Sequence, residues 1–300
     1  MRNITQDNIT QAVIARFGDT PNPRTREIFV SLVQHLHAFA RDVKLTEAEW
    51  FQGIDFLTRT GKMCDDKRQE FILLSDVLGL SMLTVAMNHD QAEGCTEPTV
   101  FGPFYVEGAP EYQTGDDIAQ GAVGDPCEVT ATIRAEDGMP IKDAVVDVWQ
   151  ADAEGHYDVQ LAGLDRAQNR GRFRTDAEGK LRFRTVVAEA YPIPVDGTVG
   201  ELLHAARRHP WRPAHLHFKI EAPGYASLIT HVFKEGDPYL DSDAVFGVRQ
   251  SLVARWEQKA EGAWRMHHDF VLARTAHDGA GATTQVHAGV EEAAPVLASA

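Results

Sequence analysis

The chain has 300 residues, 43% hydrophobic and 24% charged, which is the composition of a folded protein with length for about two domains. Lys and Arg number 29 against 44 Asp and Glu, and this net charge of −15 argues against a nucleic-acid-binding surface. No run approaches the roughly 18 apolar residues of a membrane span, and the first residues lack the apolar segment of a secretory signal. Three cysteines without a CxxC pair favour a cytoplasmic location over a disulfide framework.

The first hundred residues have the apolar spacing of helices. From Pro23, apolar residues recur at intervals of three and four, namely Ile28, Leu32, Leu36 and Phe39. Thr46 and Glu49 have the spacing of a capping box, which predicts a helix that ends near Gly61. A dense apolar run from Phe71 to Met87 predicts one largely buried helix.

Farther along the chain the apolar period becomes that of strands. Val129, Ala131 and Ile133 alternate with polar residues, as in a strand with one buried face. Further segments with strand character are Ala144 to Trp149, Phe173 to Thr175, Leu181 to Val186, Ala214 to Ile220, Leu228 to Phe233, Leu252 to Trp256 and Trp264 to Leu272. Many short strands at close spacing predict a β-sandwich.

The predicted fold class is therefore α+β, with an N-terminal helical domain followed by a β-sandwich domain. We expect the helical domain over residues 1–98 and the sandwich over residues 99–277. Residues 278–300 are rich in Ala, Gly and Thr, and we expect a flexible tail there.

Two histidines on one strand form the first candidate metal site. Because side chains alternate along a strand, His215 and His217 share a face, while Leu216 and Phe218 point to the other. This spacing suits a metal, but in a chain with 13 histidines it also fits a strand that presents them to solvent. It leaves open a zinc or Fe(II) hydrolase or oxygenase, and a non-catalytic sandwich that binds aromatic compounds.

Two tyrosines lie among glycines and prolines. Tyr157 follows Gly155, and Tyr191 precedes Pro192, which holds it extended. The alternative is that both rings are ordinary packed aromatics.

Together, several segments resemble an intradiol ring-cleaving dioxygenase. They are Trp149 to Tyr157 (WQADAEGHY), Arg170 to Thr175 (RGRFRT), Tyr191 to Pro194 (YPIP), Arg212 to His217 (RPAHLH) and Gly236 to Asp241 (GDPYLD). Within the family, Thr99 to Phe104 (TVFGPF) and Leu228 to Phe233 (LITHVF) are most similar to members that cleave hydroxyquinol. Catechol-cleaving members have glutamine at the position of His231, which argues against plain catechol as the substrate.

The resemblance implies one Fe(III) per chain, held by Tyr157, Tyr191, His215 and His217. Phenolate is a hard anionic donor that stabilises ferric iron. Tyr191 would also take a proton from the substrate, and Arg212 would stabilise negative charge on its ring.

The resemblance also implies substrates and partners. The substrates would be O2 and hydroxyquinol (benzene-1,2,4-triol), cleaved to 3-hydroxy-cis,cis-muconate or maleylacetate, with catechol or substituted catechols as the alternative. The expected substrate-binding residues are Leu73, Asp76, Val100, Phe101, Gly102, Pro103, Phe104, Pro192, Ile193, Pro194, Arg212, His231 and Val245. Family members are dimers through their helical domains and often carry lipid there, which implies a homodimer with bound phospholipid.

Overall fold

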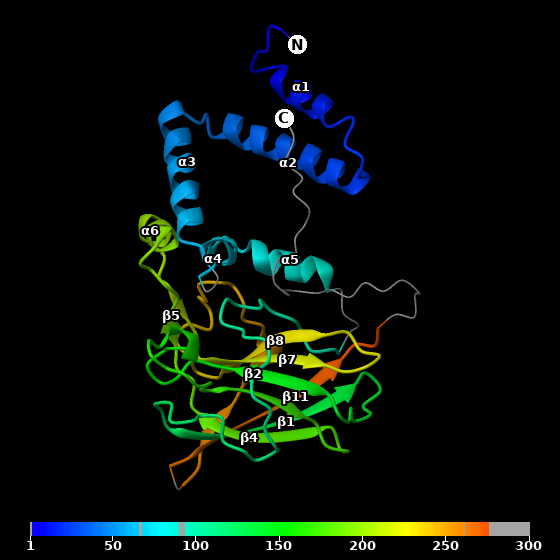
Figure 1. The fold of residues 1–300 in the computed structure, drawn as a ribbon, viewed down its shortest axis with the longest axis vertical. Helices are drawn as coiled ribbons and strands as arrows, with labels where there is room; N and C mark the ends of the chain where they lie inside the picture. The colour runs from blue at the N-terminus through cyan, green and yellow to red at the C-terminus, as the bar shows by residue number, and fades with distance from the viewer. Residues whose placement is uncertain (1, 66–67, 90–93, 261, 276–300) are drawn as a thin grey trace. The chain divides into compact units, whose positions relative to one another are not determined.

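The structure is a computed structural model that describes residues 2–65, 68–89, 94–260 and 262–275 (Figure 1). The tail predicted over residues 278–300 lies outside the described residues. The chain divides into two compact units, and unit 1 comprises Met1–Ser81 and Pro192–Trp211. Unit 2 comprises Met82–Tyr191 and Arg212–Ala300.

The helices lie mostly in unit 1. They are α1 (Ile9–Arg16), α2 (Pro23–Asp42), α3 (Glu47–Lys62), α4 (Glu70–Val77), α5 (Leu80–Asn88), whose residues from Met82 belong to unit 2, and α6 (Thr198–Ala205). The capping box is confirmed, because the Thr46 hydroxyl accepts from the Glu49 amide and the Glu49 carboxylate accepts from the Thr46 amide. Neither α1 nor α6 was predicted.

The prediction of a single buried helix from Phe71 to Met87 is wrong. The run forms α4 and α5, and the break lies at Gly79, whose φ of +75° ends a helix in the left-handed region. Leu83 and Met87 are 56% and 73% exposed in the single chain. In the part of the chain that the structure describes, no single helix is long and apolar enough to cross a membrane; α4 and α5 meet that criterion only as a bent pair.

Unit 2 contains the two main sheets. The first has the order β10-β11-β1-β4, with β1 (Pro126–Ala135), β4 (Lys180–Val186), β10 (Trp256–Gln258) and β11 (Trp264–Leu272). The second has the order β3-β2-β7-β8-β9, with β2 (Val145–Trp149), β3 (Arg170–Arg174), β7 (His215–Glu221), β8 (Leu228–Lys234) and β9 (Val253–Ala254). The short strands β5 (Tyr191–Pro192) and β6 (Trp211–Arg212) pair with each other.

The sandwich prediction is confirmed by the core that the two sheets share. Val129 and Phe183 of the first sheet lie in one buried cluster with Val146 and Phe218 of the second. The strand predicted from Leu252 to Trp256 is interrupted, because it is divided between the 3-10 helix η2 (Gln250–Leu252), β9 and β10. Since β9 and β10 join different sheets, the break lets the chain pass from one layer to the other.

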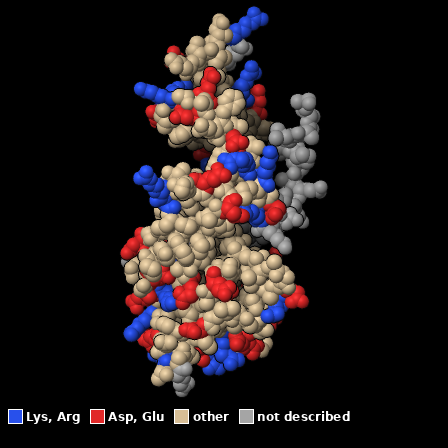
Figure 2. Space-filling model, turned by 90° about the vertical axis from the view of Figure 1, so that its left-hand side faces the viewer, with Lys and Arg blue, Asp and Glu red and all other residues tan. Residues whose placement is uncertain are grey.

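The surface of the molecule carries charges of both signs. On the face that Figure 2 shows, Asp and Glu side chains lie among Lys and Arg side chains rather than in a separate region. The excess of acidic residues is therefore not gathered into one patch on this face.

Candidate metal centre and active site

The candidate site begins on β7, which lies between β2 and β8. Its alternation places His215 and His217 on the same side, as predicted, and both side chains are buried. In register, His217 stands between Trp149 of β2 and His231 of β8.

Two tyrosines reach the same place from outside the sheet. Tyr157 immediately precedes the 3-10 helix η1 (Asp158–Gln160), and Tyr191 begins β5. Gly155 allows them to approach, because its φ is +82° and a Cβ there would lie 2.7 Å from the Cβ of Tyr191. Phe104 stacks on the Tyr157 ring with centroids 4.5 Å apart.

Four donor atoms meet at this point, and we call Tyr157, Tyr191, His215 and His217 the donor cluster. The Tyr157 hydroxyl lies 2.9 Å from Nε2 of His217 and 3.3 Å from the Tyr191 hydroxyl. Nε2 of His215 lies 3.2 Å from Nε2 of His217. Ligand atoms about 2 Å from one metal ion lie about 3 Å apart, so this set fits a single ion.

Burial shifts the pKa values of three members of the donor cluster, Tyr157, His215 and His217. Burial and the neighbouring Tyr191 hydroxyl raise the pKa of Tyr157 well above its ordinary value. Burial and the nearby charge of Arg212 lower the pKa of His215 to about 3. Burial, with His215 and Arg212, also lowers the pKa of His217 well below its ordinary value. The imidazoles are therefore neutral, as metal ligands must be, whereas Tyr157 ionises only if a cation is close.

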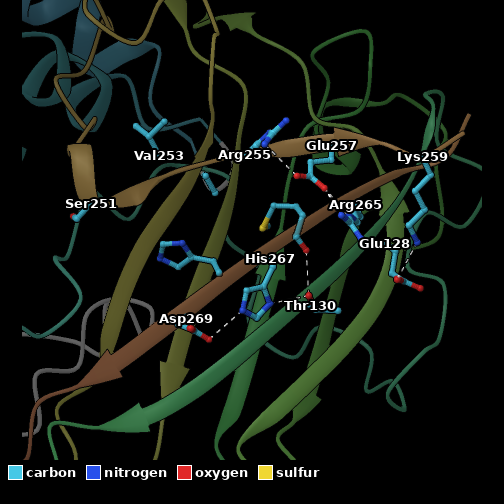
Figure 3. Close-up of a pocket in the computed structure, with 13 residues that line it drawn as sticks. Glu128, Thr130, Ser251, Val253, Arg255, Glu257, Lys259, Arg265, His267 and Asp269 are labelled. Atoms are coloured by element: carbon cyan, nitrogen blue, oxygen red, sulfur yellow. Dashed lines mark hydrogen bonds and ion pairs between the residues drawn. The ribbon is translucent and has the colours of Figure 1, made fainter. Parts of the chain in front are cut away.

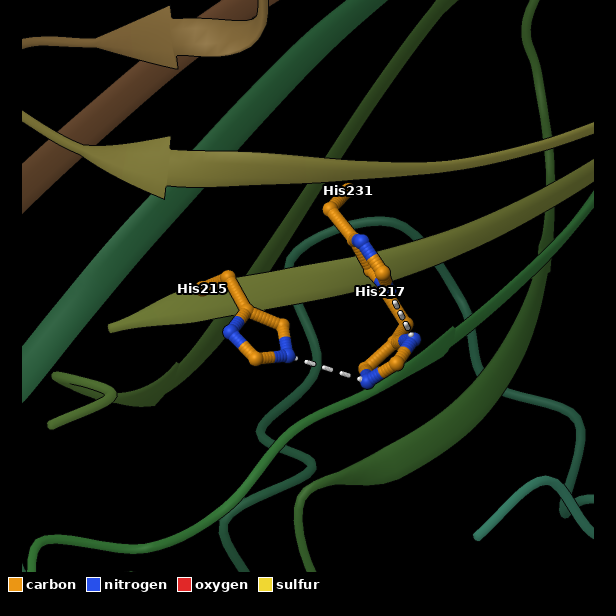
Figure 4. Close-up of side chains that lie close together, drawn as sticks. All are labelled: His215, His217 and His231. Atoms are coloured by element: carbon orange, nitrogen blue, oxygen red, sulfur yellow. Dashed lines mark hydrogen bonds between the residues drawn. The ribbon is translucent and has the colours of Figure 1, made fainter. Parts of the chain in front are cut away.

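A third buried histidine lies beside this cluster. His231 could form a metal-binding group with His215 and His217, since one nitrogen from each lies within 4.8 Å of the others. Figure 4 shows, however, that His215 and His231 contact different nitrogens of His217. The Tyr157 hydroxyl contacts the same nitrogen as His215, so His231 lies behind His217 with respect to the donor cluster.

Arg212 brings a permanent positive charge to the cluster. Its Nη1 lies 3.3 Å from Nε2 of His215, and the side chain is buried. Burial opposes the charged form, but the attraction of Asp243 outweighs it and raises the pKa of Arg212. A guanidinium held here can stabilise negative charge on a bound molecule.

The residues predicted to bind substrate fall into two groups. The first group belongs to unit 2, as does the donor cluster, and comprises Val100, Phe101, Gly102, Pro103, Phe104, Arg212, His231 and Val245. A Cβ on Gly102 would lie 3.1 Å from Cε1 of His217, so this segment lies against the His217 ring. Leu73, Asp76, Pro192, Ile193 and Pro194 belong to unit 1. Of these, Leu73 and Asp76 are buried residues of α4.

Three residues that matter here were not predicted as site residues. Thr99 contacts His231, Asp243 contacts Arg212, and the Trp149 ring stacks on His217 with centroids 4.6 Å apart. Trp149 and Thr99 do lie within motifs that carried the resemblance, which was the available signal.

A separate groove of about 610 Å³ is lined by residues of β1, β9, β10 and β11 (Figure 3). Its three Lys and Arg side chains equal its three Asp and Glu side chains in number. Lys259 pairs with Glu128, Arg255 and Arg265 pair with Glu257, and Asp269 lies beside His267. These pairs leave the groove without an excess of either charge, so the donor cluster is the better candidate for the active site.

In a comparison with known proteins, two family models match consecutive parts of the chain. The family model described as "Catechol dioxygenase N terminus" matches residues 22–96, and the model described as "Dioxygenase" matches residues 100–274.

Individual relatives align over most of their length. A 6-chlorohydroxyquinol 1,2-dioxygenase of Cupriavidus pinatubonensis is 65% identical, covering 91% of this chain and 99% of the relative. A hydroxyquinol 1,2-dioxygenase of Nocardioides simplex is 48% identical, and the match covers 86% of this chain and 88% of the relative. The crystal structure of hydroxyquinol 1,2-dioxygenase from Pseudomonas putida DLL-E4 superposes with a TM-score of 0.84 at 46% identity, covering 90% and 99%.

Proposed function

The chain belongs to the intradiol ring-cleavage dioxygenase family, and on that premise we propose that it cleaves hydroxyquinol with O2 between its adjacent hydroxyl-bearing carbons. The product would be 3-hydroxy-cis,cis-muconate or its tautomer maleylacetate. The observation that carries the proposal is the convergence of two phenol and two imidazole donors in the donor cluster. Family membership supports an intradiol dioxygenase over the zinc or Fe(II) hydrolase or oxygenase, and over the non-catalytic sandwich, that the spacing of the histidines left open.

We propose one Fe(III) per chain, held by Tyr157, Tyr191, His215 and His217. Contacts of 2.9–3.3 Å among their donor atoms support this. Hard phenolate oxygens favour ferric iron, whereas imidazoles alone suit Fe(II) or zinc equally. The chemistry that the ion would supply is Lewis-acid polarisation of a bound aromatic diol.

The surrounding residues would then act on protons, charge and solvent. Tyr191 accepts a proton from one substrate hydroxyl at its own phenolic oxygen. Arg212 stabilises the negative charge that builds on the ring carbon, an effect that a dry site strengthens. All four residues of the donor cluster are buried, which supports a site from which water is excluded.

The relatives support the choice of substrate. Relatives at 48% and 47% identity are named as hydroxyquinol 1,2-dioxygenases, and the relative at 65% as a 6-chlorohydroxyquinol 1,2-dioxygenase. The chlorinated triol is therefore a second candidate substrate. Twelve of the thirteen residues predicted above remain the proposed substrate contacts, whereas His231 lies behind His217, in contact with Nδ1 of that ring.

For unit 1 we propose a role in dimer formation. None of the residues of α2 is buried in the single chain, and Leu32, Leu36 and Phe39 are 56%, 56% and 54% exposed. An apolar face of this kind favours a partner, and a second copy with phospholipid at the interface is the arrangement that the resemblance implies. We keep residues 1–98 and 99–277 as the proposed domains. The three free cysteines support the cytoplasm as the proposed location.

The decisive experiment is a visible absorption spectrum with metal analysis of the purified protein. Ferric phenolate gives a charge-transfer band, so concentrated protein should be reddish and contain iron, and Tyr157→Phe should lose both. Oxygen uptake with hydroxyquinol tests the reaction. A colourless protein with zinc would contradict the ferric site, and no uptake by iron-loaded protein would contradict the reaction.

A further inference from the structure

The two ring nitrogens of His217 have different surroundings. Nε2 faces the donor cluster, 2.9 Å from the Tyr157 hydroxyl and 3.2 Å from Nε2 of His215. Nδ1 faces away from it and lies 2.8 Å from Nε2 of His231 (Figure 4). His231 in turn places its Nδ1 2.9 Å from Oγ1 of Thr99. These contacts link Thr99, His231 and His217 in one chain of hydrogen bonds.

The protons in this series of hydrogen bonds have one arrangement that leaves His217 able to bind a metal. A neutral imidazole has a single N–H, so Nε2 of His217 can offer a lone pair only if its proton is on Nδ1. That proton is donated to Nε2 of His231. His231 then carries its own proton on Nδ1 and donates it to the Thr99 hydroxyl. Thr99, His217 and His231 are 2%, 1% and 0% exposed, so bulk water does not compete for these bonds.

His215 reaches the same tautomer by a different means. Its Nδ1 lies 2.7 Å from the carbonyl oxygen of Pro213, which can only accept, so the proton is on Nδ1. A backbone carbonyl therefore orients one histidine, whereas a side chain orients the other. Stacking on Trp149 at 15° fixes the plane of the His217 ring but does not decide which nitrogen carries the proton.

We propose that His231 and Thr99 are positioning residues that hold His217 in the tautomer and orientation that present Nε2 to the metal. The inference rests on the proposed function, because it takes His217 as an iron ligand. Groups that receive the second N–H of a metal-bound histidine commonly govern metal affinity, and their loss costs about 10- to 100-fold.

Substitutions at His231 and Thr99 test this on the iron-loaded enzyme. His231→Phe keeps a ring but removes the acceptor, and we expect iron affinity to fall by about 10- to 100-fold. His231→Gln supplies a carbonyl acceptor and an amide donor and should restore most of it. Thr99→Val removes only the last acceptor and should cost about tenfold. The readouts are iron per chain and the rate at which a chelator bleaches the visible band.

Thr230 provides the matched control. It directly precedes His231 in β8 and is fully buried, and its hydroxyl donates to the Glu97 carbonyl at 2.7 Å, outside the chain of bonds. Thr230→Val therefore deletes an equally buried hydroxyl and should retain iron as the wild type does. Equal loss from Thr99→Val and Thr230→Val would overturn the proposal, and this comparison stands even if His231→Phe does not fold.

His217→Ala distinguishes a failure of the proposed metal site from a failure of the positioning role alone. If it keeps iron as tightly as the wild type, His217 is not a ligand and the proposed metal site fails. If it loses iron while His231→Phe and Thr99→Val retain it, the metal site stands and only the positioning role is wrong.

Discussion

Arg212 and Asp243 form a two-point ion pair inside unit 2. Nε of Arg212 lies 3.0 Å from Oδ1 of Asp243 and Nη2 lies 3.3 Å from Oδ2. The carboxylate also accepts from the amides of Val245 and Gly247. Asp243 thus fixes the guanidinium through two nitrogens and leaves the third, Nη1, beside His215.

Arg212→Lys should lower turnover while keeping iron. A lysine keeps the charge, but its compact ammonium cannot occupy both carboxylate oxygens and reach the substrate. We expect kcat to fall by about 10²-fold, the scale of other lost electrostatic donors. Steady-state oxygen uptake measures this, with the visible band as the control for iron. Wild-type turnover in an iron-loaded variant would remove Arg212 from the mechanism.

Asp243→Ala should destabilise the fold, because it leaves Arg212 as an unpaired buried charge. Breaking a buried pair in this way costs about 3–5 kcal/mol in the free energy of unfolding. The exposed pair of Asp137 and Arg274, 2.8 Å apart, is the matched comparison. Asp137→Ala should leave the urea midpoint almost unchanged. Similar urea midpoints for Asp243→Ala and Asp137→Ala would show that the buried pair contributes no more to stability than the exposed pair.

Gly102→Ala should weaken the hold on iron. Its φ of +77° costs a non-glycine residue about 1–2 kcal/mol, and the new Cβ would lie 3.1 Å from the His217 ring. Gly108 has a similar φ of +73° but nothing within 4 Å of a Cβ. Gly108→Ala should therefore lower the temperature of thermal unfolding through backbone strain. It should not release iron faster than the wild type, whereas Gly102→Ala should. Identical iron release from the two variants would show that the contact with His217 is unimportant.

Stability should fall between pH 6.5 and 4, partly through His268. Burial lowers the pKa of His268 to about 4 from 6.5, although Asp269 opposes this. Over this interval the unfolded chain binds a proton that the folded chain does not, so stability is lost as the pH falls and the loss is complete near pH 4. His268→Asn should reduce that loss by about 1–3 kcal/mol. Urea titrations of this variant and of the wild type across the interval would measure the difference.

Asp76→Ala should narrow the preference for hydroxyquinol over catechol. Asp76 is 3% exposed within the apolar helix α4, and the resemblance predicts that it accepts a hydrogen bond from the third hydroxyl. A site that hydrogen-bonds a substrate hydroxyl rejects the analogue that lacks it, because the analogue cannot make that hydrogen bond. The ratio of kcat/KM for the two substrates measures this. An unchanged ratio in the variant would exclude Asp76 as the selector.

Local rules allowed much of this structure to be predicted. Alternation along β7 predicted that His215 and His217 share a face, and the spacing of Thr46 and Glu49 predicted the start of α3. Both depend only on residues close together in the chain. The break at Gly79 was missed because the apolar residues on either side continue one pattern, while the glycine alone carries the signal for the turn.

The supporting residues could not be predicted in this way. Thr99 and His231 are 132 positions apart, and Arg212 and Asp243 are 31 apart. Such pairs meet only because two sheets and several loops bring them together, and no short-range period records that. The resemblance to a family predicted the four donor residues, but the contacts that orient them are visible only in the three-dimensional structure.

The register of β7 also has a consequence for refolding. His217 is aligned with Trp149 on one side and His231 on the other. A slip by one residue would exchange the two faces of β7 and turn both histidines toward the apolar core. A metal that binds only the correctly paired sheet stabilises it over every slipped alternative by mass action. Iron would then favour the native pairing of β7 over slipped pairings. The return of the visible absorption band during refolding would report the last stage of assembly.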